Sequence, residues 1–511
     1  MGLATYILLY GVTFLAAAVL AAYLFSTRKF GHWKKKGVKD LTPIPFAGSL
    51  KDVVLMRKPL GVVTKEIYEE FKTERFIGIY AFDEPVLQIH DLDLVKAVLV
   101  KDFQYFCDRS LHADENVDPF LARAIFCLKG DRWKKCRTAI SPGFTPGKMK
   151  RVFILISECV DLLVSQIEKD SQKGLPIDVN ELAARYTTDA IASCAFGIQG
   201  HTLENPNAEF RRIMRLTFEF TPKEALALVS AFLSPKLTSL LGLKLIRSEV
   251  TNFILNTIST AITERETHQI KRNDLLDSLI QLKNSGVITD EDELDTQQNK
   301  AFHKFDMWDV MGNSLALLMA GFETSATTIA YVLYELAMNP DVQSKLREEI
   351  HDSISKQTLS YESLHDMKYL DMVLQETLRK YPPLAFIDRV SNKPYTLPGT
   401  TVTLEAGSRI LIPSYGFHMN PEYYPNPKRF DPERFSEQNK HAKYSYLPFG
   451  EGPRNCAGIR FAGMQVKTAI ARIICKYSVH PSSTTPTEID FTPKTFLLQP
   501  KGGLEFIFKA I

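Results

Sequence analysis

Apolar residues are unevenly distributed along the chain, and the longest apolar run lies near its start. From Leu3 to Phe25 no residue is charged, and a helix of this length can cross a hydrocarbon core of about 30 Å. Basic residues follow at 28, 29 and 34–36, so the positive-inside bias predicts that the rest of the chain lies in the cytosol. We therefore predict a membrane anchor over residues 1–27. A cleaved secretory signal is the alternative, although no positive charge precedes the apolar run.

The segment after the anchor changes in character. Thr42-Pro43-Ile44-Pro45 cannot continue a helix, because proline lacks the N–H donor and favours an extended residue before it. We predict a basic, proline-containing hinge over residues 28–50 and a single catalytic domain over 51–511. Within that domain, Arg75–Tyr80 and Val86–His90 predict a β-hairpin around Asp83-Glu84-Pro85.

Helical periodicity dominates the remainder of the chain. Amphipathic helices are predicted at 146–168, 246–266 and 341–355, and the polar stretch 268–300 is predicted to be a solvated connector. From Tyr395 short β-branched runs alternate with Pro and Gly, and a helical pattern returns after Gly458. The pattern alone predicts a helix-rich protein with smaller β portions.

One predicted helix is unusually long. No proline occurs between Phe305 and Asn339, and Pro340 follows directly. Such a helix would extend for about 50 Å, enough to cross a whole domain. A second membrane span is the alternative, but Asp309, Glu323 and Glu335 would make it costly.

The composition argues against several classes of function. A net charge of +3 on 511 residues does not indicate a nucleic-acid-binding protein. The cysteine count of seven is odd, with no C-x-x-C pair, which argues against a disulfide framework and a structural zinc site and fits a reducing compartment. For six of these cysteines we expect the ordinary role of a small buried apolar residue.

Cys456 is the exception, because it ends a loop of unusual composition. Residues 446–458 contain three glycines and two prolines, and a helical stretch follows, beginning near Ile459. A cysteine just before a helix is favoured as thiolate by the helix dipole and the free N–H groups, and a thiolate is a strong axial ligand for haem iron. Glycine-rich loops before helices more often bind phosphate, but this loop lacks the Lys-Ser/Thr ending of a P-loop.

The long helix carries a second unusual stretch, Ala320-Gly321-Phe322-Glu323-Thr324-Ser325. Small residues allow a flat ligand to approach the backbone, and a hydroxyl bonded back to a carbonyl can open the helix for a water molecule. A helix-packing seam with incidental polar residues is the alternative.

Together these segments resemble the cytochrome P-450 family. Its F-x-x-G-x-R-x-C-x-G loop is matched by Phe449, Gly452, Arg454, Cys456 and Gly458. Residues 320–325 match its A-G-x-(D/E)-T-(T/S) helix, and Trp133 and Arg137 match its W-x-x-x-R pair. Glu376 and Arg379 match its E-x-x-R pair, and Arg434 matches the arginine that completes that set. Residues 42–45 and 420–424 are similar to those of microsomal, xenobiotic-metabolising arthropod members.

The resemblance implies a fold and a set of residue roles. The fold would be mainly α with a minor β portion, the triangular prism of the family, preceded by a transmembrane helix. Cys456 would bind the iron of haem b, with Phe449 packed beside it. Thr324 and Glu323 would handle protons. The remaining sites would be haem contacts at Trp133, Arg137, Arg389, Arg454 and Gly458, and a stabilising set at Glu376, Arg379 and Arg434.

The implied reaction is insertion of one oxygen atom from O2 into a small lipophilic molecule. NADPH-cytochrome P-450 reductase would supply electrons, with cytochrome b5 as a further partner, at the cytosolic face of the endoplasmic reticulum membrane. A solvated face or a reductase-docking surface explains the basic residues 134, 135, 148, 150 and 151. Substrate contacts are expected around 120–125, 322, 384–387 and 497–498. A peroxide-rearranging enzyme of the same fold and a non-catalytic haem protein remain the alternatives.

Overall fold

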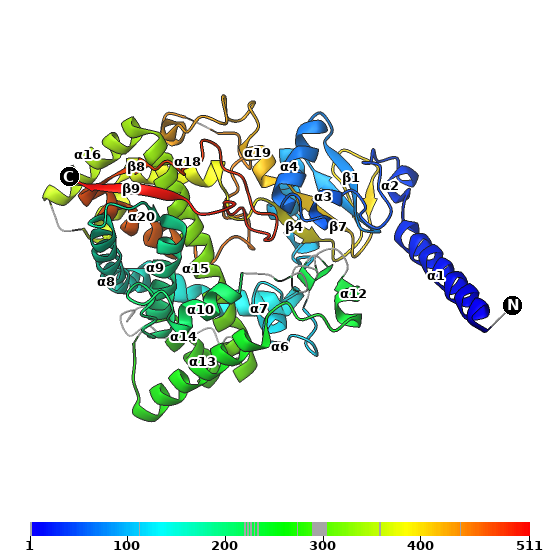
Figure 1. The fold of residues 1–511 in the computed structure, drawn as a ribbon, viewed down its shortest axis with the longest axis horizontal. Coiled ribbons are helices and arrows are strands. Elements are labelled where there is room, and N and C mark those ends of the chain that lie inside the picture. Colours follow the sequence, from blue (N-terminus) through cyan, green and yellow to red (C-terminus); the bar gives the residue numbers. More distant parts are fainter. Residues whose placement is uncertain are drawn as a thin grey trace.

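The N-terminal helix stands apart from the rest of the protein. The computed structural model describes residues 3–511 except 112, 219–220, 222–223, 225–226, 229, 232–234, 273, 289–303, 357–358 and 440. Helix α1 (Leu3–Thr27) is apolar, long enough to cross a membrane, and not buried against the other elements. Figure 1 shows it extending away from the remaining helices and sheets. This exposure is what a membrane anchor requires.

The predicted hinge is attached to the first hairpin, β1 (Phe76–Ala81) and β2 (Glu84–Ile89). The short helix α2 (His32–Lys35) places Trp33 against this hairpin, where its indole Nε1 donates to Ile79 O at 3.2 Å. Arg28 and Lys29 pair with Asp83 at 2.9 Å and with Glu84 at 2.6 Å, at the turn of the hairpin. Arg28 and Lys29 therefore bind the β1–β2 hairpin.

The larger sheet lies at the end of the protein nearest to α1 (Figure 1). Its order is β1-β2-β7-β4, with β4 at Ile387–Val390 and β7 at Arg409–Ile412. Strands β1 and β2 are antiparallel, β2 and β7 parallel, and β4 and β7 antiparallel. The predicted hairpin is present, but β2 already begins at Glu84, so the turn is shorter than expected.

The predicted long helix is the centre of the helical part. Helix α15 (Met307–Met338) begins with a capping box in which Asp306 and Asp309 bond each other's backbone N–H groups. It packs against α9 (Val179–Phe196), α6 (Pro119–Arg123) and α20 (Ile459–Lys476). Most of its length is buried inside the protein, which is the environment of a core helix rather than of a second membrane span.

The other predicted helices are α8 (Pro146–Ser171), α13 (Ser248–His268) and α16 (Pro340–Lys356). The prediction of a solvated connector at 268–300 is wrong for α14 (Leu275–Asn284), because this helix buries Leu275, Leu276, Leu279 and Leu282. Its leucines recur at helical spacing, a signal that the surrounding polar residues obscure. Residues 289–300 of that prediction lie outside the described residues.

The remaining elements are short. The helices are α3 (Lys51–Val54), α4 (Leu60–Glu70), α5 (Leu92–Lys96), α7 (Gly130–Ile140), α10 (Glu209–Leu216), α12 (Pro235–Leu240), α17 (Tyr361–Asp366), α18 (Lys368–Lys380) and α19 (Ser414–His418). The strands are β3 (Ile177–Asp178), β5 (Tyr395–Thr396), β6 (Thr403–Leu404), β8 (Tyr477–Pro481) and β9 (Glu505–Ala510), in sheets β3-β9-β8 and β5-β6. The prediction of a mainly helical fold with a minor β portion is confirmed.

Candidate active site

The loop before α20 has a backbone that depends on its glycines. Gly450 and Gly452 have positive φ values of 70° and 73°, a conformation that other residues rarely adopt. A Cβ on Gly452 would also collide with the backbone oxygen of Leu99. The loop closes through a hydrogen bond from Cys456 N to Phe449 O at 2.9 Å. Gly458 is the N-cap of α20, so Cys456 lies directly before the helix, as predicted.

The Cys456 thiol experiences opposing influences. Its surface is accessible to water although protein atoms surround it closely. Burial raises its pKa, while the Gly458 N–H group and the cations of Arg137 and Arg109 lower it without cancelling that effect. The expectation that the helix terminus alone favours the thiolate is therefore only partly met. The N–H group and the cations are nevertheless placed to stabilise a thiolate once it forms.

Three arginines gather near this loop from distant parts of the chain. Arg389 is fully buried on β4, Arg454 belongs to the cysteine loop, and Arg109 follows η2 (Phe103–Tyr105). Arg109 Nη2 approaches Arg454 O at 3.5 Å, and Arg454 lies over the Trp133 ring at 4.4 Å. Burial lowers the pKa of Arg389 to about 9 and that of Arg454 to about 10, and the proximity of Arg109 adds to both effects.

This cluster suits an anionic ligand. Among the described residues, the Nε atoms of Arg109, Arg389 and Arg454 are buried without a hydrogen-bond partner. The carboxylates that offset them are Asp108 and Asp388. A buried polar group without a hydrogen-bond partner is costly, and guanidinium groups bind carboxylates well. The arrangement therefore fits a group that carries two carboxylates, such as the propionates of haem b.

Arg137, the second predicted partner of the W-x-x-x-R pair, lies closer to the cysteine. Both residues of the pair are on α7, with Trp133 buried and Arg137 half-buried. Arg137 Nη2 donates to Asn455 Oδ1 at 2.9 Å, beside Cys456 in the loop. The structure thus brings Trp133 to Arg454 and Arg137 to the cysteine.

The middle of α15 carries partly exposed polar side chains, although most of the helix is buried. Ala320 is exposed and Thr324 and Glu323 are half-buried, although Ser325 and the residues after it are buried. The Thr324 hydroxyl donates to Ala320 O at 2.7 Å, and the Thr328 hydroxyl donates to Thr324 O at 2.8 Å. The Glu323 carboxylate accepts a hydrogen bond from the side-chain amide of Gln499. The predicted back-bonding hydroxyl is therefore present.

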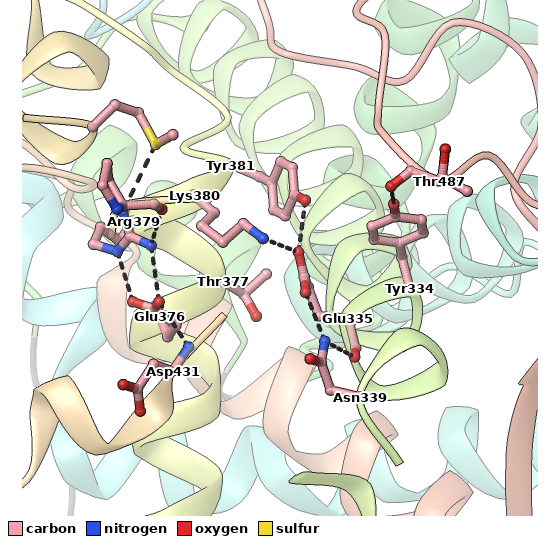
Figure 2. Close-up of polar contacts among 12 residues, drawn as sticks. Tyr334, Glu335, Asn339, Glu376, Thr377, Arg379, Lys380, Tyr381, Asp431 and Thr487 are labelled. Atoms are coloured by element: carbon pink, nitrogen blue, oxygen red, sulfur yellow. Dashed lines mark hydrogen bonds and ion pairs between the residues drawn. The ribbon is translucent and has the colours of Figure 1, made fainter. Parts of the chain in front are cut away.

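The predicted stabilising set forms a buried network, of which Figure 2 shows Glu376 and Arg379. Arg379 Nε donates to Glu376 Oε2 at 2.7 Å, and Arg379 Nη2 donates to Glu376 Oε1 at 2.8 Å, with neither side chain exposed. Arg434 Nε and the backbone N–H of Asp431 reach the same carboxylate at 3.3 and 3.0 Å. Arg379 also donates to the carbonyl oxygens of residues 418 and 427. This is a fully satisfied ion network rather than a surface pair.

The basic residues around α7 and α8 do not form one surface. Lys134, Lys135 and Lys150 are exposed, and Lys150 pairs with Glu362 at 2.6 Å. Lys148 is buried and donates to Ser278 Oγ at 3.0 Å. The expectation that Lys148 belongs to a solvated or docking face is wrong, because α8 turns this residue toward α14.

The regions expected to contact substrate lie in two places. Residues 384–387 and 497–498 are adjacent, since Leu498 N donates to Pro383 O at 3.0 Å. Phe120 is on α6, which packs against α15, and stacks near Trp308 at 5.2 Å. Phe322 is fully buried and contacts Phe218 at 5.4 Å, so it packs within the protein.

Sequence reasoning missed Arg109, Asp388 and Gln499. Arg109 belongs to no compact motif, and Asp388 binds Ser110 from the far end of the sequence. An isolated bridge between Asp108 and Val390 joins these two segments. The relevant signal is a pairing between residues more than 250 positions apart, which no local pattern contains.

Comparison with known proteins gives one family along the chain. The family model described as Cytochrome P450 matches residues 38–506. Cytochrome P450 6j1 of Blattella germanica is 42% identical over 489 residues, which cover 95% of this chain and 94% of the relative. Cytochrome P450 6k1 of the same species is 40% identical, covering 97% and 96%, and Cytochrome P450 6B2 of Helicoverpa armigera is 35% identical, covering 96% of each chain.

Proposed function

This chain belongs to the cytochrome P450 family of haem b monooxygenases, and we propose that Cys456 is its iron ligand and a small lipophilic molecule its substrate. The observation that carries the proposal is the environment of the Cys456 sulfur, where the Gly458 N–H group and the cations of Arg137 and Arg109 converge on an accessible thiol. The cysteine loop is also held by its own backbone bond from Cys456 to Phe449. A thiolate at this position would be stabilised on the protein side.

Haem supplies the activation of O2 when it is bound, and the protein holds it through its arginines. We assign the two propionates to Arg109, Arg389 and Arg454, which gather near the cysteine loop and each have a buried Nε atom without a partner, together with Trp133 and Arg137. Guanidinium groups fixed by surrounding backbone oxygens suit this task because they bind carboxylates with defined geometry. Arg454, for example, is oriented by the carbonyl oxygens of Phe126 and Leu128.

Thr324 and Glu323 are assigned to proton handling. The Thr324 hydroxyl hydrogen is directed to Ala320 O, so the lone pairs of its oxygen are free to accept a hydrogen bond from a water molecule. Glu323 follows in the chain at a half-buried position, where a carboxylate can exchange protons with water. A positioned acid–base group of this kind accelerates proton transfer.

We also propose a location and partners. Helix α1 would anchor the chain in the endoplasmic reticulum membrane with the catalytic domain in the cytosol, which the attachment of Arg28 and Lys29 to the β1–β2 hairpin supports. NADPH-cytochrome P450 reductase would deliver electrons, and the exposed Lys134 and Lys135 would belong to its docking face. Cytochrome b5 is a further proposed donor.

The absorption spectrum of the reduced, CO-bound protein tests the ligand. Thiolate ligation shifts the Soret band strongly to the red, and Cys456→Ala is expected to abolish that band. Cys475→Ala is the matched control, because Cys475 is a half-buried cysteine near the other end of α20. A red-shifted band that persists in Cys456→Ala would assign the iron to another residue.

Turnover separates the candidate activities. With reductase and NADPH, we expect oxygenated product from a panel of lipophilic compounds. A peroxide-rearranging enzyme would act on lipid peroxides without NADPH, and a non-catalytic haem protein would show the spectrum without NADPH-dependent product. Thr324→Ala is expected to retain haem while more of the NADPH oxidised yields peroxide. Unchanged coupling in this variant would refute the proton role of Thr324.

A further inference from the structure

The Glu323 carboxylate is contacted by a residue from the C-terminal end of the chain. Gln499 lies in the loop between β8 and β9, 176 positions beyond Glu323, and its Nε2 donates to Glu323 Oε1. Both side chains are half-buried, so the contact is shielded but water can reach it. A hydrogen bond in such a place helps to fix the orientation of the carboxylate.

The backbone around Gln499 is held on both sides. Thr492 N donates to Gln499 O at 2.9 Å, and Gln499 N donates to Leu497 O at 3.0 Å. An antiparallel bridge between Phe491 and Pro500 closes the loop. The neighbouring Leu498 is fully buried. The Gln499 side chain therefore starts from a fixed point, which a residue that orients another group needs.

The same loop is tied a second time to the helix that carries Glu323. The Tyr331 hydroxyl on α15 donates to Leu498 O at 2.9 Å. Tyr331 stacks on Tyr381 at 4.4 Å, and the Tyr381 hydroxyl donates to Glu335 at 2.6 Å. Figure 2 shows Glu335 receiving this bond together with those of Lys380 and Asn339. The loop is thus bonded to α15 at two residues, Glu323 and Tyr331.

From this geometry we infer that Gln499 is a positioning residue, which holds the Glu323 carboxylate beside Thr324 for proton delivery. The inference rests on the proposed function of Glu323. A neutral amide suits the task because it orients the carboxylate without the fixed positive charge that an arginine or lysine would add. The carboxylate remains able to take up and release a proton, which a proton carrier must do.

The loop also touches a region expected to contact substrate. Leu498 N donates to Pro383 O at 3.0 Å, directly before residues 384–387. A change in this segment on substrate binding would therefore be transmitted to Gln499 through one backbone bond. This connection gives proton delivery at Glu323 a structural dependence on what occupies the substrate region.

The test uses the full-length haem protein with reductase and NADPH. Gln499→Met removes the amide donor and keeps the side-chain length, and Gln499→Glu replaces the donor with a carboxylate that repels Glu323. For both variants we expect product formed per NADPH oxidised to fall by a factor of about three to ten, the scale of one net hydrogen bond. The KM for substrate is expected to change little, and the solvent deuterium isotope effect on kcat is expected to rise. Lys494→Leu, at an exposed position of the same loop, is the matched control and should leave both quantities unchanged.

A double-mutant comparison decides whether Gln499 acts through Glu323. In a Glu323→Gln background, Gln499→Met should cause no further loss of coupling, because its target is already absent. Additive losses would overturn the inference. If Glu323→Gln uncouples the enzyme and neither Gln499 variant does, the inference is wrong and the proposed function stands. If Glu323→Gln itself couples like the wild type, the proposed proton role of Glu323 and the inference that rests on it both fail. The CO-bound spectrum of each variant verifies that haem and fold are retained.

Discussion

Replacement of Arg389 by methionine is expected to have opposite effects on the haem-free and haem-loaded protein. The Arg389 side chain is 1% exposed, and Nη1 donates to Asp388 O at 2.7 Å. Among the described residues its Nε has no partner. Methionine keeps similar length and removes the charge. Without a ligand the substitution removes the free-energy cost of a buried charge, whereas with haem bound it would remove the propionate contact that we propose for Arg389.

The size of the cost follows from the pKa of Arg389. Burial, with the nearby Arg109 and Arg454, lowers this pKa from 12.5 to about 9, so the folded state disfavours the charged form by about 5 kcal/mol, at about 1.4 kcal/mol per tenfold. The unfolded chain keeps the ordinary pKa and binds more protons between pH 9 and 12.5, so stability rises with pH only in that window. At neutral pH the free energy of unfolding of the haem-free protein is therefore lowered by this full amount. Asp388 loses a favourable neighbour in the variant, so we expect a net stabilisation of about 1–4 kcal/mol.

Two measurements check this prediction. Urea unfolding of haem-free protein is expected to show the higher free energy of unfolding in Arg389→Met. Transfer of haem to a scavenging apoprotein is expected to be faster by a factor of about 10 to 100, the scale of one charge-assisted hydrogen bond. Arg409→Met, on the neighbouring strand β7 opposite Val390, is the control and should leave haem release unchanged. A variant that is less stable without haem would show that Arg389 stabilises the fold itself.

Three further substitutions follow from the described contacts. Glu376→Gln removes the charge at the centre of the buried network and is expected to cost about 3–5 kcal/mol, measured by urea unfolding of the haem protein; a loss below 1 kcal/mol would contradict the buried ion pair. Gly452→Ala is expected to reduce the red-shifted CO band because of its positive φ and the close backbone oxygen, whereas Gly463→Ala, with open space around it, should retain the band. Asp83→Arg is expected to speed cleavage after α1 by the non-specific protease proteinase K, because it breaks the pair with Arg28. The reversed pair, Arg28→Asp with Asp83→Arg, should restore protection, and equal cleavage rates in all three proteins would refute the attachment.

Local patterns predicted the elements whose signal lies within one segment. The apolar run became α1, and the proline-free stretch became α15 with its end at Pro340. The cysteine loop was predictable because its glycines, its cysteine and the following helix are contiguous. Helix α14 was missed because its four buried leucines are diluted by polar neighbours. Periodicity over a short window cannot outweigh the composition of a long polar stretch.

Parts of the site that depend on distant contacts were less predictable. Trp133 and Arg137 are one helical turn apart, so their common location follows from spacing. Arg109 reaches the site beside a bridge between Asp108 and Val390, and Gln499 contacts Glu323 across 176 positions of the chain. The burial of Lys148 also depends on such a contact, because α8 packs its side chain against Ser278 of α14. Spacing within one element predicts neighbours, whereas the tertiary fold decides which elements meet.

The Cys456 environment shows how the protein and the iron divide the work of forming a thiolate. A helix N-terminus favours a thiolate, and the Gly458 N–H group and Arg137 act in that direction. Burial acts against it and is the larger effect, so the pKa of the thiol is raised. A bound metal ion deprotonates a coordinating thiol outright. If Cys456 is the iron ligand, as we propose, the Gly458 N–H group and Arg137 would stabilise the sulfur once it is charged, and the positive charge of the metal would supply the remaining stabilisation of the thiolate.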